Sequence, residues 1–410
     1  MAQLQIRPSA QRSEPLPLLR PGLAQPCRDQ TCVKPVSPVL SDSLSLSTRR
    51  GTVPVPASPE PAFPDNTAAK ARIEVFFTRP GNPPAPDQLP PDPVNGPEPV
   101  DPLAPNHWRS PDQALAELIG SARQSVEIAA FELDNALIRD AILKAHGAGR
   151  LVRVVTDNEH RQEKAILALE AAGIEVVDDQ RAGLMHNKFV VIDQGTPEAA
   201  IWTGSMNLTD NCVNKNNNNA LLIRSPELAE NYHAEFEEMF VDKSFGRTSP
   251  AFVPHPQVSV GKSLIETHFA AEGHVAGRVV EALNQAKQSI HFMAFSFTHD
   301  AIGQVVAAKL ADKVSVHGVF EKTGSGSQYS EYTRLKALGA DVRTDSNPGI
   351  LHHKVFIIDG KTVITGSFNF SESADESNDE NLLIIEDPEL AKLYLEEFER
   401  VNREEVGRRS

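Results

Sequence analysis

The chain has 410 residues, of which 40% are hydrophobic and 23% charged, and its formal net charge is −15. It contains no run of 18 apolar residues, which excludes a transmembrane helix, and its three cysteines make no disulfide framework. Cys27 and Cys32 lack a second pair of ligands, so we expect no zinc site. Because no apolar segment near the N-terminus is long enough for a secretory signal, we expect a soluble, cytoplasmic protein.

The acidic balance also bears on the partner. Phosphate neutralisation by basic side chains supplies most of the affinity for nucleic acid, and basic segments dock on anionic membranes. The charge therefore argues mildly against tight binding to either surface. A local basic cleft can still form, from Lys188, Lys354, Arg181, Lys215 and Arg343.

Proline content divides the chain. Of the 31 prolines, 23 fall within residues 1–105. We predict a disordered Pro/Ser-rich tail over 1–70, because that segment cannot bury enough apolar surface to offset its ordering entropy. A first unit is predicted over 71–247, with a Pro-rich insertion at 79–106 that is either a plain disordered insertion, which we favour, or a lid or substrate-gating loop. A second unit is predicted over 258–406.

The first unit alternates strand and helix patterns in chain order. Period-two and continuous apolar runs predict strands at 73–77, 125–132, 151–156, 174–177, 186–192, 199–203 and 219–223. Helical periodicity predicts helices at 112–123, 135–148, 161–172 and 226–240. The fold class is therefore α/β, with a mostly parallel or mixed sheet flanked by helices.

The second unit repeats the first. Pro226-Glu227-Leu228-Ala229 returns as Pro388-Glu389-Leu390-Ala391, and Ile73-Glu74 returns as Ile265-Glu266. The chain is thus two tandem, pseudo-symmetric α/β units. We expect them to pack face to face around one shared active site, and to act as a monomer because both copies lie in one chain.

A short polar phrase occurs once in each unit. Residues 186–193 read HNKFVVID and are followed by GSMN at 204–207, whereas residues 352–359 read HHKVFIID and are followed by GSFN at 366–369. One such His-x-Lys pair would mean little, and two core histidines in unrelated strands is the plainer interpretation. The whole phrase, present twice, is highly specific.

Strand parity assigns the members of the phrase to faces. Side chains of a strand alternate with period two, so His186 and Lys188 share a face, as do His352 and Lys354. Asp193 and Asp359 lie five positions beyond the lysines and point away. We therefore expect these aspartates to be structural, and to bind backbone or a helix end behind the sheet.

The shared residues suit metal-independent phosphodiester cleavage. Lys188, Lys354, Asn207 and Asn369 can hold the non-bridging phosphate oxygens. One histidine can attack phosphorus, and the other can protonate the leaving oxygen and then activate water. Further residues are expected to bind substrate or pack a tight turn: Ser205 and Ser367. Neither a metal nor a cofactor is required.

Each histidine also needs a partner that fixes its ring. We predict that Glu380 orients His352, and alignment of the repeats places Asn218 at the matching position of the first unit. A surface acid and a polar loop are the plainer interpretations of these two residues. With a carboxylate beside it, His352 would favour its charged form and serve as proton donor, leaving His186 as nucleophile.

These motifs resemble the phospholipase D superfamily, whose defining phrase is His-x-Lys-x4-Asp-x6-Gly-Ser-x-Asn. The second copy fits it fully, whereas the first has ten residues between Asp193 and Gly204, which predicts an enlarged hairpin around Gly195. The resemblance covers roughly residues 73–402. It implies a two-lobed fold, no metal, a nucleophile at His186, and a glutamate such as Glu380 that orients a catalytic histidine.

Three functions fit these observations. The first is hydrolysis of phospholipid phosphodiester bonds, or phosphatidyl transfer, which the acidic surface favours. The second is endonuclease cleavage of DNA or RNA, which the compact units favour. A non-catalytic scaffold that kept the fold is the third, and the completeness of both His/Lys/Asn sets argues against it.

Overall fold

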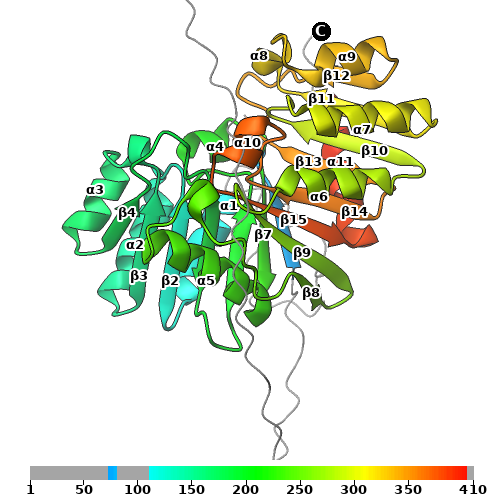
Figure 1. Cartoon of the computed structure of the whole chain (residues 1–410). Helices are drawn as coiled ribbons and strands as arrows, with labels where there is room; N and C mark the ends of the chain where they lie inside the picture. Colours follow the sequence, from blue (N-terminus) through cyan, green and yellow to red (C-terminus); the bar gives the residue numbers. More distant parts are fainter. Residues whose placement is uncertain (1–72, 81–109, 404–410) are drawn as a thin grey trace, which may run out of the picture. The chain divides into compact units, whose positions relative to one another are not determined.

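The computed structural model describes residues 73–80 and 110–403 (Figure 1). The predicted disordered tail and all but the start of the predicted Pro-rich insertion lie outside these residues. We call Ile73–Phe240 the first repeat and Gln257–Arg403 the second repeat. Among the described residues, no helix is long and apolar enough to cross a membrane.

The elements of the first repeat follow the expected alternation. Its strands are β1 (Ile73–Phe77), β2 (Ser125–Ala130), β3 (Leu151–Thr156), β4 (Glu175–Asp178), β5 (Lys188–Ile192), β6 (Ala200–Gly204) and β7 (Asn219–Arg224). Its helices are α1 (Pro111–Ser121), α2 (Ala136–Gly147), the 3-10 turn η3 (Asn158–His160), α3 (Lys164–Ala171), α4 (Asp210–Asn214) and α5 (Pro226–Phe240). The short helix α4 was not predicted.

The second repeat follows the same order with one extra strand, β8. After the 3-10 turn η4 (Gly246–Thr248), its strands are β8 (Gln257–Val260), β9 (Ser263–Ala270), β10 (Ser289–Ala294), β11 (Ser315–Phe320), β12 (Asp341–Thr344), β13 (Lys354–Ile358), β14 (Thr362–Gly366) and β15 (Glu380–Glu386). Its helices are α6 (Val275–Asn284), α7 (Asp300–Ala311), α8 (Lys322–Ser325), α9 (Glu331–Ala337), α10 (Glu372–Glu376) and α11 (Pro388–Arg403).

Each repeat is built on one mixed sheet. The first has the order β1-β7-β6-β5-β2-β3-β4, and the second β12-β11-β10-β13-β14-β15-β9-β8. In the first sheet β2, β3 and β4 pair in parallel and the remaining neighbours are antiparallel. Of the two expected sheet types, the mixed one is therefore present. The α/β prediction with helices on both faces is confirmed.

Local chemistry explains where the long helices begin. Ser225 caps α5, because its side chain accepts the Leu228 N–H while Pro226 occupies the first turn, where a missing N–H costs nothing. Asn135 caps α2 in the same way through the Ile138 N–H. The strands β5 (KFVVI) and β13 (KVFII) are buried throughout, as expected for continuous apolar runs.

The buried apolar residues of the described part of the chain form three cores. One is confined to the first repeat and joins one face of its sheet to α1, α2 and α3. A second does the same for the second repeat with α6, α7 and α9. The third is shared: it joins the opposite faces of both sheets to α5 and α11. The two repeats are thus held together by a common core.

Buried polar side chains seal this junction in a two-fold pattern. Thr203 Oγ1 donates to Asn381 Oδ1 (2.7 Å), and Thr365 Oγ1 donates to Asn219 Oδ1 (2.9 Å). The segment that leads into the first motif contacts the second repeat directly: the His186 N–H donates to the Asp379 carbonyl (3.0 Å). Predicted strand 186–192 therefore begins two residues late, at Lys188, and His186 lies at the junction.

Candidate active site

Each motif histidine is held by a side chain of the other repeat. His186 Nδ1 lies 2.7 Å from Glu380 Oε2, and His352 Nδ1 lies 2.8 Å from Asn218 Oδ1. All four side chains are buried. In both cases the ring is fixed through Nδ1, which leaves Nε2 available for chemistry.

The predicted pairing of Glu380 with His352 is therefore wrong. The two repeats cross at the junction, so β15, which begins with Glu380, reaches the first repeat's histidine. The argument that a carboxylate beside His352 makes this residue the proton donor is therefore wrong as well. The plainer interpretation of Glu380 as a surface acid is also wrong, because its exposed fraction is 0%.

The orientation of Asn218 settles the tautomer of His352. Its Nδ2 donates to the Cys212 carbonyl (3.0 Å), so Oδ1 faces the histidine and also accepts from Ser205 Oγ (3.0 Å). An amide oxygen accepts hydrogen bonds, so His352 Nδ1 carries the proton. In the second repeat Ser367 Oγ plays the same part and donates to Glu380 Oε2 (2.7 Å).

Ser205 and Ser367 thus position the histidine partners. They stand beside glycines that allow the strands to approach closely. A Cβ on Gly204 would lie 2.4 Å from the Asn219 carbonyl oxygen, and φ there is +146°. This close approach explains why the phrase needs glycine before serine.

The two lysines lie against the same structures in both repeats. Lys188 Nζ donates to the His186 carbonyl (2.7 Å), and Lys354 Nζ donates to the His352 carbonyl (3.1 Å). Lys188 Nζ also stands 5.0 Å from the centroid of the Phe131 ring, an aromatic contact that favours its charge. Parity is confirmed for the lysines, since both stay with their histidines.

Burial and mutual repulsion dominate the electrostatics of the site. Burial lowers the pKa of His186 and of His352 well below the ordinary value, and the charges of Lys188 and Lys354 lower both further. Burial also lowers the pKa of Lys188 to about 8, against the opposing charge of Glu380. Burial and the charge of Lys188 lower the pKa of Lys354 well below its ordinary value. Such a site is suited to an anion, whose charge would raise all four pKa values.

The motif asparagines follow β6 and β14, directly after the serines that bind the histidine partners. Asn207 Nδ2 donates to Glu132 Oε2 (3.0 Å), and the Oδ1 atoms of Asn207 and Asn369 are buried without a hydrogen-bond partner in the described part of the chain. Glu132 also lies 3.5 Å from His160 Nε2. One of the two asparagines is therefore already engaged by a carboxylate.

The motif aspartates are structural, as predicted. Asp193 accepts the backbone N–H groups of Arg123, Gln124 and Ser125 at 2.7–3.2 Å, at the start of β2. Asp359 does the same for Lys287, Gln288 and Ser289, at the start of β10. Each aspartate ties its hairpin to the neighbouring strand. The enlarged first hairpin is also present, between Ile192 and Ala200.

The suggested basic cleft does not form. Arg181 is engaged by the Asp379 carboxylate and the Ser377 carbonyl, and Arg343 donates to the Asn402 carbonyl at the end of α11. Lys215 is exposed on the loop after α4. The lysines of the phrase therefore provide the positive charge at the site.

One group of side chains in the described residues has metal-ligand geometry, and it is separate from the phrase: Glu127, His233 and Glu237. Arg153 donates to both of its carboxylates, at 2.6 and 2.5 Å, and the bond to Glu127 raises the pKa of His233. The cluster is thus an ion-pair network that is already neutralised by its own cations.

Sequence reasoning missed the aromatic and acidic residues around the histidines. Phe131 packs edge-on against His186 and Phe295 against His352, each with ring centroids 4.9 Å apart. His160 also packs edge-on against Phe131, with ring centroids 4.5 Å apart. The signal was present, because Phe131 and Phe295 follow equivalent strands of the two repeats.

The fold and the site together place the chain in the class of two-lobed phosphodiesterases. The family described as "cardiolipin synthase, PLD-like domain" matches residues 115–240 and 279–402. The chain therefore belongs to the phospholipase D-like family, and it is a phosphodiesterase of that superfamily.

Individual proteins agree with this placement. The phospholipase D of Rickettsia prowazekii is 31% identical over 163 residues, which are 40% of this chain and 80% of that protein. The human mitochondrial cardiolipin hydrolase is 37% identical over 124 residues, 30% of this chain and 49% of that protein. The phosphatidylserine synthase structure from Haemophilus influenzae has the same fold, with a TM-score of 0.57, 14% identity, and coverage of 72% of this chain and 84% of that one.

Proposed function

We propose that the chain hydrolyses the phosphodiester bond of phospholipids through a phosphohistidine on His186. The observation that carries the proposal is the crossed pair of histidines, His186 with Glu380 and His352 with Asn218. The names of the relatives, a phospholipase D and a cardiolipin hydrolase, support a lipid substrate. The net charge of −15 argues mildly against tight binding of a polyanionic nucleic acid, as it does for an anionic membrane.

The two histidine partners support different roles. A histidine phosphorylated on Nε2 and protonated on Nδ1 is a cation, and the Glu380 carboxylate would stabilise that charge. Asn218 offers His352 a neutral acceptor, so its imidazolium gives up a proton more readily. His186 is therefore the nucleophile on grounds different from those the sequence suggested, and His352 is the proton donor.

The steps balance without a metal. Nε2 of His186 attacks phosphorus, the bond to the headgroup oxygen breaks, and that oxygen takes a proton from Nε2 of His352. Water then attacks the phosphohistidine and gives a proton to His352. The N–P bond breaks, which releases phosphatidic acid. Lys188, Lys354, Asn207 and Asn369 are proposed to hold the non-bridging oxygens throughout.

The test is incubation with phosphatidylglycerol in detergent micelles and, separately, with plasmid DNA and RNA, all in EDTA. The proposal predicts phosphatidic acid from the lipid and no cleavage of nucleic acid. The His352→Ala variant, purified in parallel, controls for contaminating enzymes. Nucleic-acid cleavage without lipid hydrolysis would replace this proposal with the endonuclease, and inactivity on all three substrates would favour the scaffold.

A further inference from the structure

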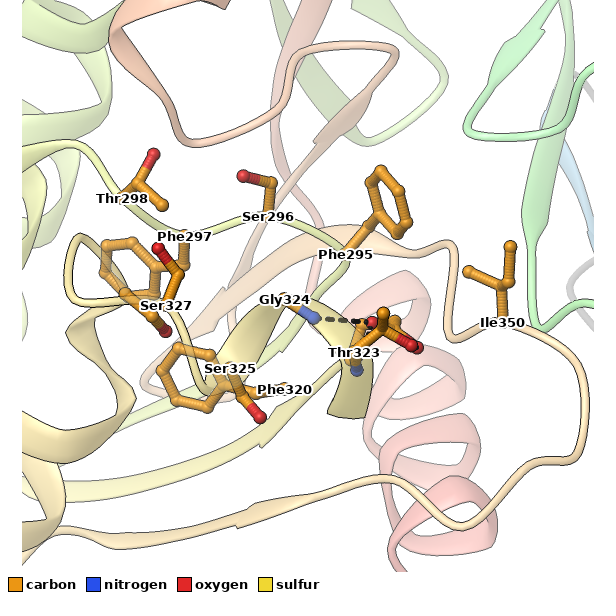
Figure 2. A pocket seen from close by; sticks show the side chains of 12 residues that line it. Phe295, Ser296, Phe297, Thr298, Phe320, Thr323, Gly324, Ser325, Ser327 and Ile350 are labelled. Carbon is orange, nitrogen blue, oxygen red and sulfur yellow. Dashed lines mark hydrogen bonds between the residues drawn. The ribbon is translucent and has the colours of Figure 1, made fainter. Parts of the chain in front are cut away.

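Figure 2 shows a pocket in the second repeat that Phe295 and Gly324 help to line. Its volume is about 490 Å³, and it lies close to His352. Phe295 forms the wall between the two: it lines the pocket, its ring packs edge-on against His352, and Lys354 Nζ lies 4.8 Å from its centroid. Ile350, two residues before His352, lines the pocket as well. A ligand in the pocket would therefore contact Phe295, whose ring separates it from His352.

The pocket exists because of a difference between the repeats. Glu321 caps the turn after β11 as Asp157 caps the turn after β3, and counting from these caps puts Gly324 where the first repeat has His160. The His160 ring lies on Phe131 and is bound to Glu163 (2.7 Å). At Gly324 the corresponding space is open, since an added Cβ would meet just the Phe295 carbonyl oxygen, at 3.9 Å.

The pocket offers hydroxyl groups rather than charge. Ser296 and Thr298 line it where the first repeat has the acids Glu132 and Asp134, and their hydroxyls have no hydrogen-bond partner within residues 73–80 and 110–403. Glu321 is the one acid among the lining residues. Its carboxylate is engaged by the Thr323 and Gly324 N–H groups (2.6 and 3.0 Å) and by the Thr323 hydroxyl.

These walls are poorly suited to a quaternary ammonium. Cation recognition uses open aromatic faces, usually with a free carboxylate nearby. Phe297 and Phe320 are buried and stack on each other at 5.8 Å, so their faces are occupied. A hydroxyl-bearing, uncharged group finds both apolar walls and free hydroxyls there, the combination that binding pockets use for orientation.

We propose that this pocket binds the headgroup alcohol that leaves from the phosphodiester, and that it selects an uncharged polyol of the glycerol or inositol kind over a choline-like alcohol. The inference rests on the proposed lipid hydrolysis and names the headgroup class of that same site. The leaving oxygen must lie beside His352 to receive its proton, and the headgroup attached to that oxygen then extends past Phe295 into the pocket.

The test compares headgroups on one diacylglycerol in mixed micelles: phosphatidylglycerol, phosphatidylcholine and phosphatidylmethanol. Phosphatidylmethanol carries the same net charge as phosphatidylglycerol, and its methanol is too small to fill the pocket. We expect kcat/KM to be higher for phosphatidylglycerol than for either comparison lipid by roughly tenfold, the order of magnitude that one net hydrogen bond supplies.

Gly324→His should fill the pocket with the residue of the first repeat and lower the ratio of phosphatidylglycerol to phosphatidylmethanol turnover by about tenfold. Gly326→His is the matched control, because Gly326 lies in the same turn, outside the pocket and with open space around it. That control should keep the ratio. Ser296→Ala with Thr298→Val is a second, milder variant that should lower the ratio without adding volume.

An unchanged ratio in Gly324→His, or a wild-type preference for phosphatidylcholine, would overturn the headgroup assignment while lipid hydrolysis stood. Equal loss on all three lipids in a folded variant would also overturn it, because the pocket would then serve the shared diacylglycerol. Absence of phosphatidic acid from every lipid with the wild-type protein would instead overturn the proposed function itself, and the headgroup assignment with it.

Discussion

Behind the site, the two repeats use the same backbone positions with different charges. In the second repeat Glu397 is bound by His353 (3.1 Å) and by Arg400 (2.6 Å). In the first repeat the equivalent Glu235 is bound by the neutral Asn187 (3.0 Å), and the position of Arg400 is taken by another acid, Glu238.

The pKa values of these three glutamates follow the charge of their neighbours. Burial raises the pKa of Glu235 well above its ordinary range, and nearby Glu272 raises it further. Burial likewise raises the pKa of Glu238 to about 8. For Glu397 burial acts in the same direction, but Arg400 and His353 outweigh it and the net pKa is lowered. The repeats have thus kept the geometry at these positions while their charge diverged.

The largest effect should come from residues that the repeats have in common. We expect His186→Ala, His352→Ala, Lys188→Ala and Lys354→Ala each to lower kcat by several powers of ten, because each removes a nucleophile, an acid or a phosphate donor. Phosphatidic acid release measures it. Asp193→Asn is the control, since its carboxylate binds backbone behind the sheet. If a histidine or lysine variant kept more than about a tenth of the activity, the substituted residue would not be catalytic.

The next effect tests the unequal partners of the histidines. Glu380→Gln should lower kcat about 100-fold and Asn218→Ala about tenfold, because a charged partner stabilises the phosphohistidine and a neutral one merely orients the ring. The double variant Glu380→Gln/Asn218→Asp moves the carboxylate to His352. We expect it to stay as low as Glu380→Gln. Recovery of activity in that double variant would mean that the two histidines are interchangeable.

A smaller effect should appear in stability. The folded-state pKa of Glu238, about 8, lies above its ordinary 4.5, so the folded protein holds this proton more tightly than the unfolded chain. The contribution of this group to stability is then fully present below pH 4.5 and is lost as the pH rises through about 8. Glu238→Gln should remove this loss and stabilise the protein at pH 9 by on the order of 2 kcal/mol, with little change at pH 4.

Thermal unfolding at pH 4, 7 and 9 measures this difference. Arg400→Gln is the counterpart in the second repeat and should destabilise at neutral pH, since it strips Glu397 of its main cation. An equal gain from Glu238→Gln at all three pH values would show that Glu238 is not protonated in the folded state.

The smallest expected effect is that of metal removal. Because histidines and lysines supply the nucleophile, the acid and the positive charge, EDTA should leave phosphatidic acid release unchanged. The profile of kcat/KM against pH should be bell-shaped, since one histidine must be neutral and the other protonated. Loss of activity in EDTA, restored by a divalent cation, would contradict this mechanism.

The local parts of this site were predictable from sequence. The doubled phrase identified His186, Lys188, His352 and Lys354, and strand parity correctly turned Asp193 away from them. Fold class and repeat followed from periodicity and from the repeated Pro-Glu-Leu-Ala. Each of these features depends on residues that are close in the chain, where spacing alone fixes geometry.

What failed depends on how the two repeats meet. Glu380 was assigned to His352, the histidine of its own repeat, because sequence does not show that the strands cross at Asp379 and Asn217. Arg181 was considered for a local basic cleft, whereas it binds Asp379 of the other repeat. The pocket at Gly324 was also missed. The pocket is open because Gly324 has no side chain where the first repeat has His160. This difference is recognised when the turns of the two repeats are compared in the structure.

The most direct test of the account is to identify the histidine that becomes phosphorylated. The enzyme is mixed with phospholipid labelled at phosphorus, quenched with base to preserve the N–P bond, digested, and mapped by mass spectrometry. Glu380 beside His186 predicts the label on the peptide that contains His186, and none in His186→Ala. Label on the peptide containing His352 would contradict the assignment of roles, and no labelled peptide under single-turnover conditions would contradict the covalent mechanism.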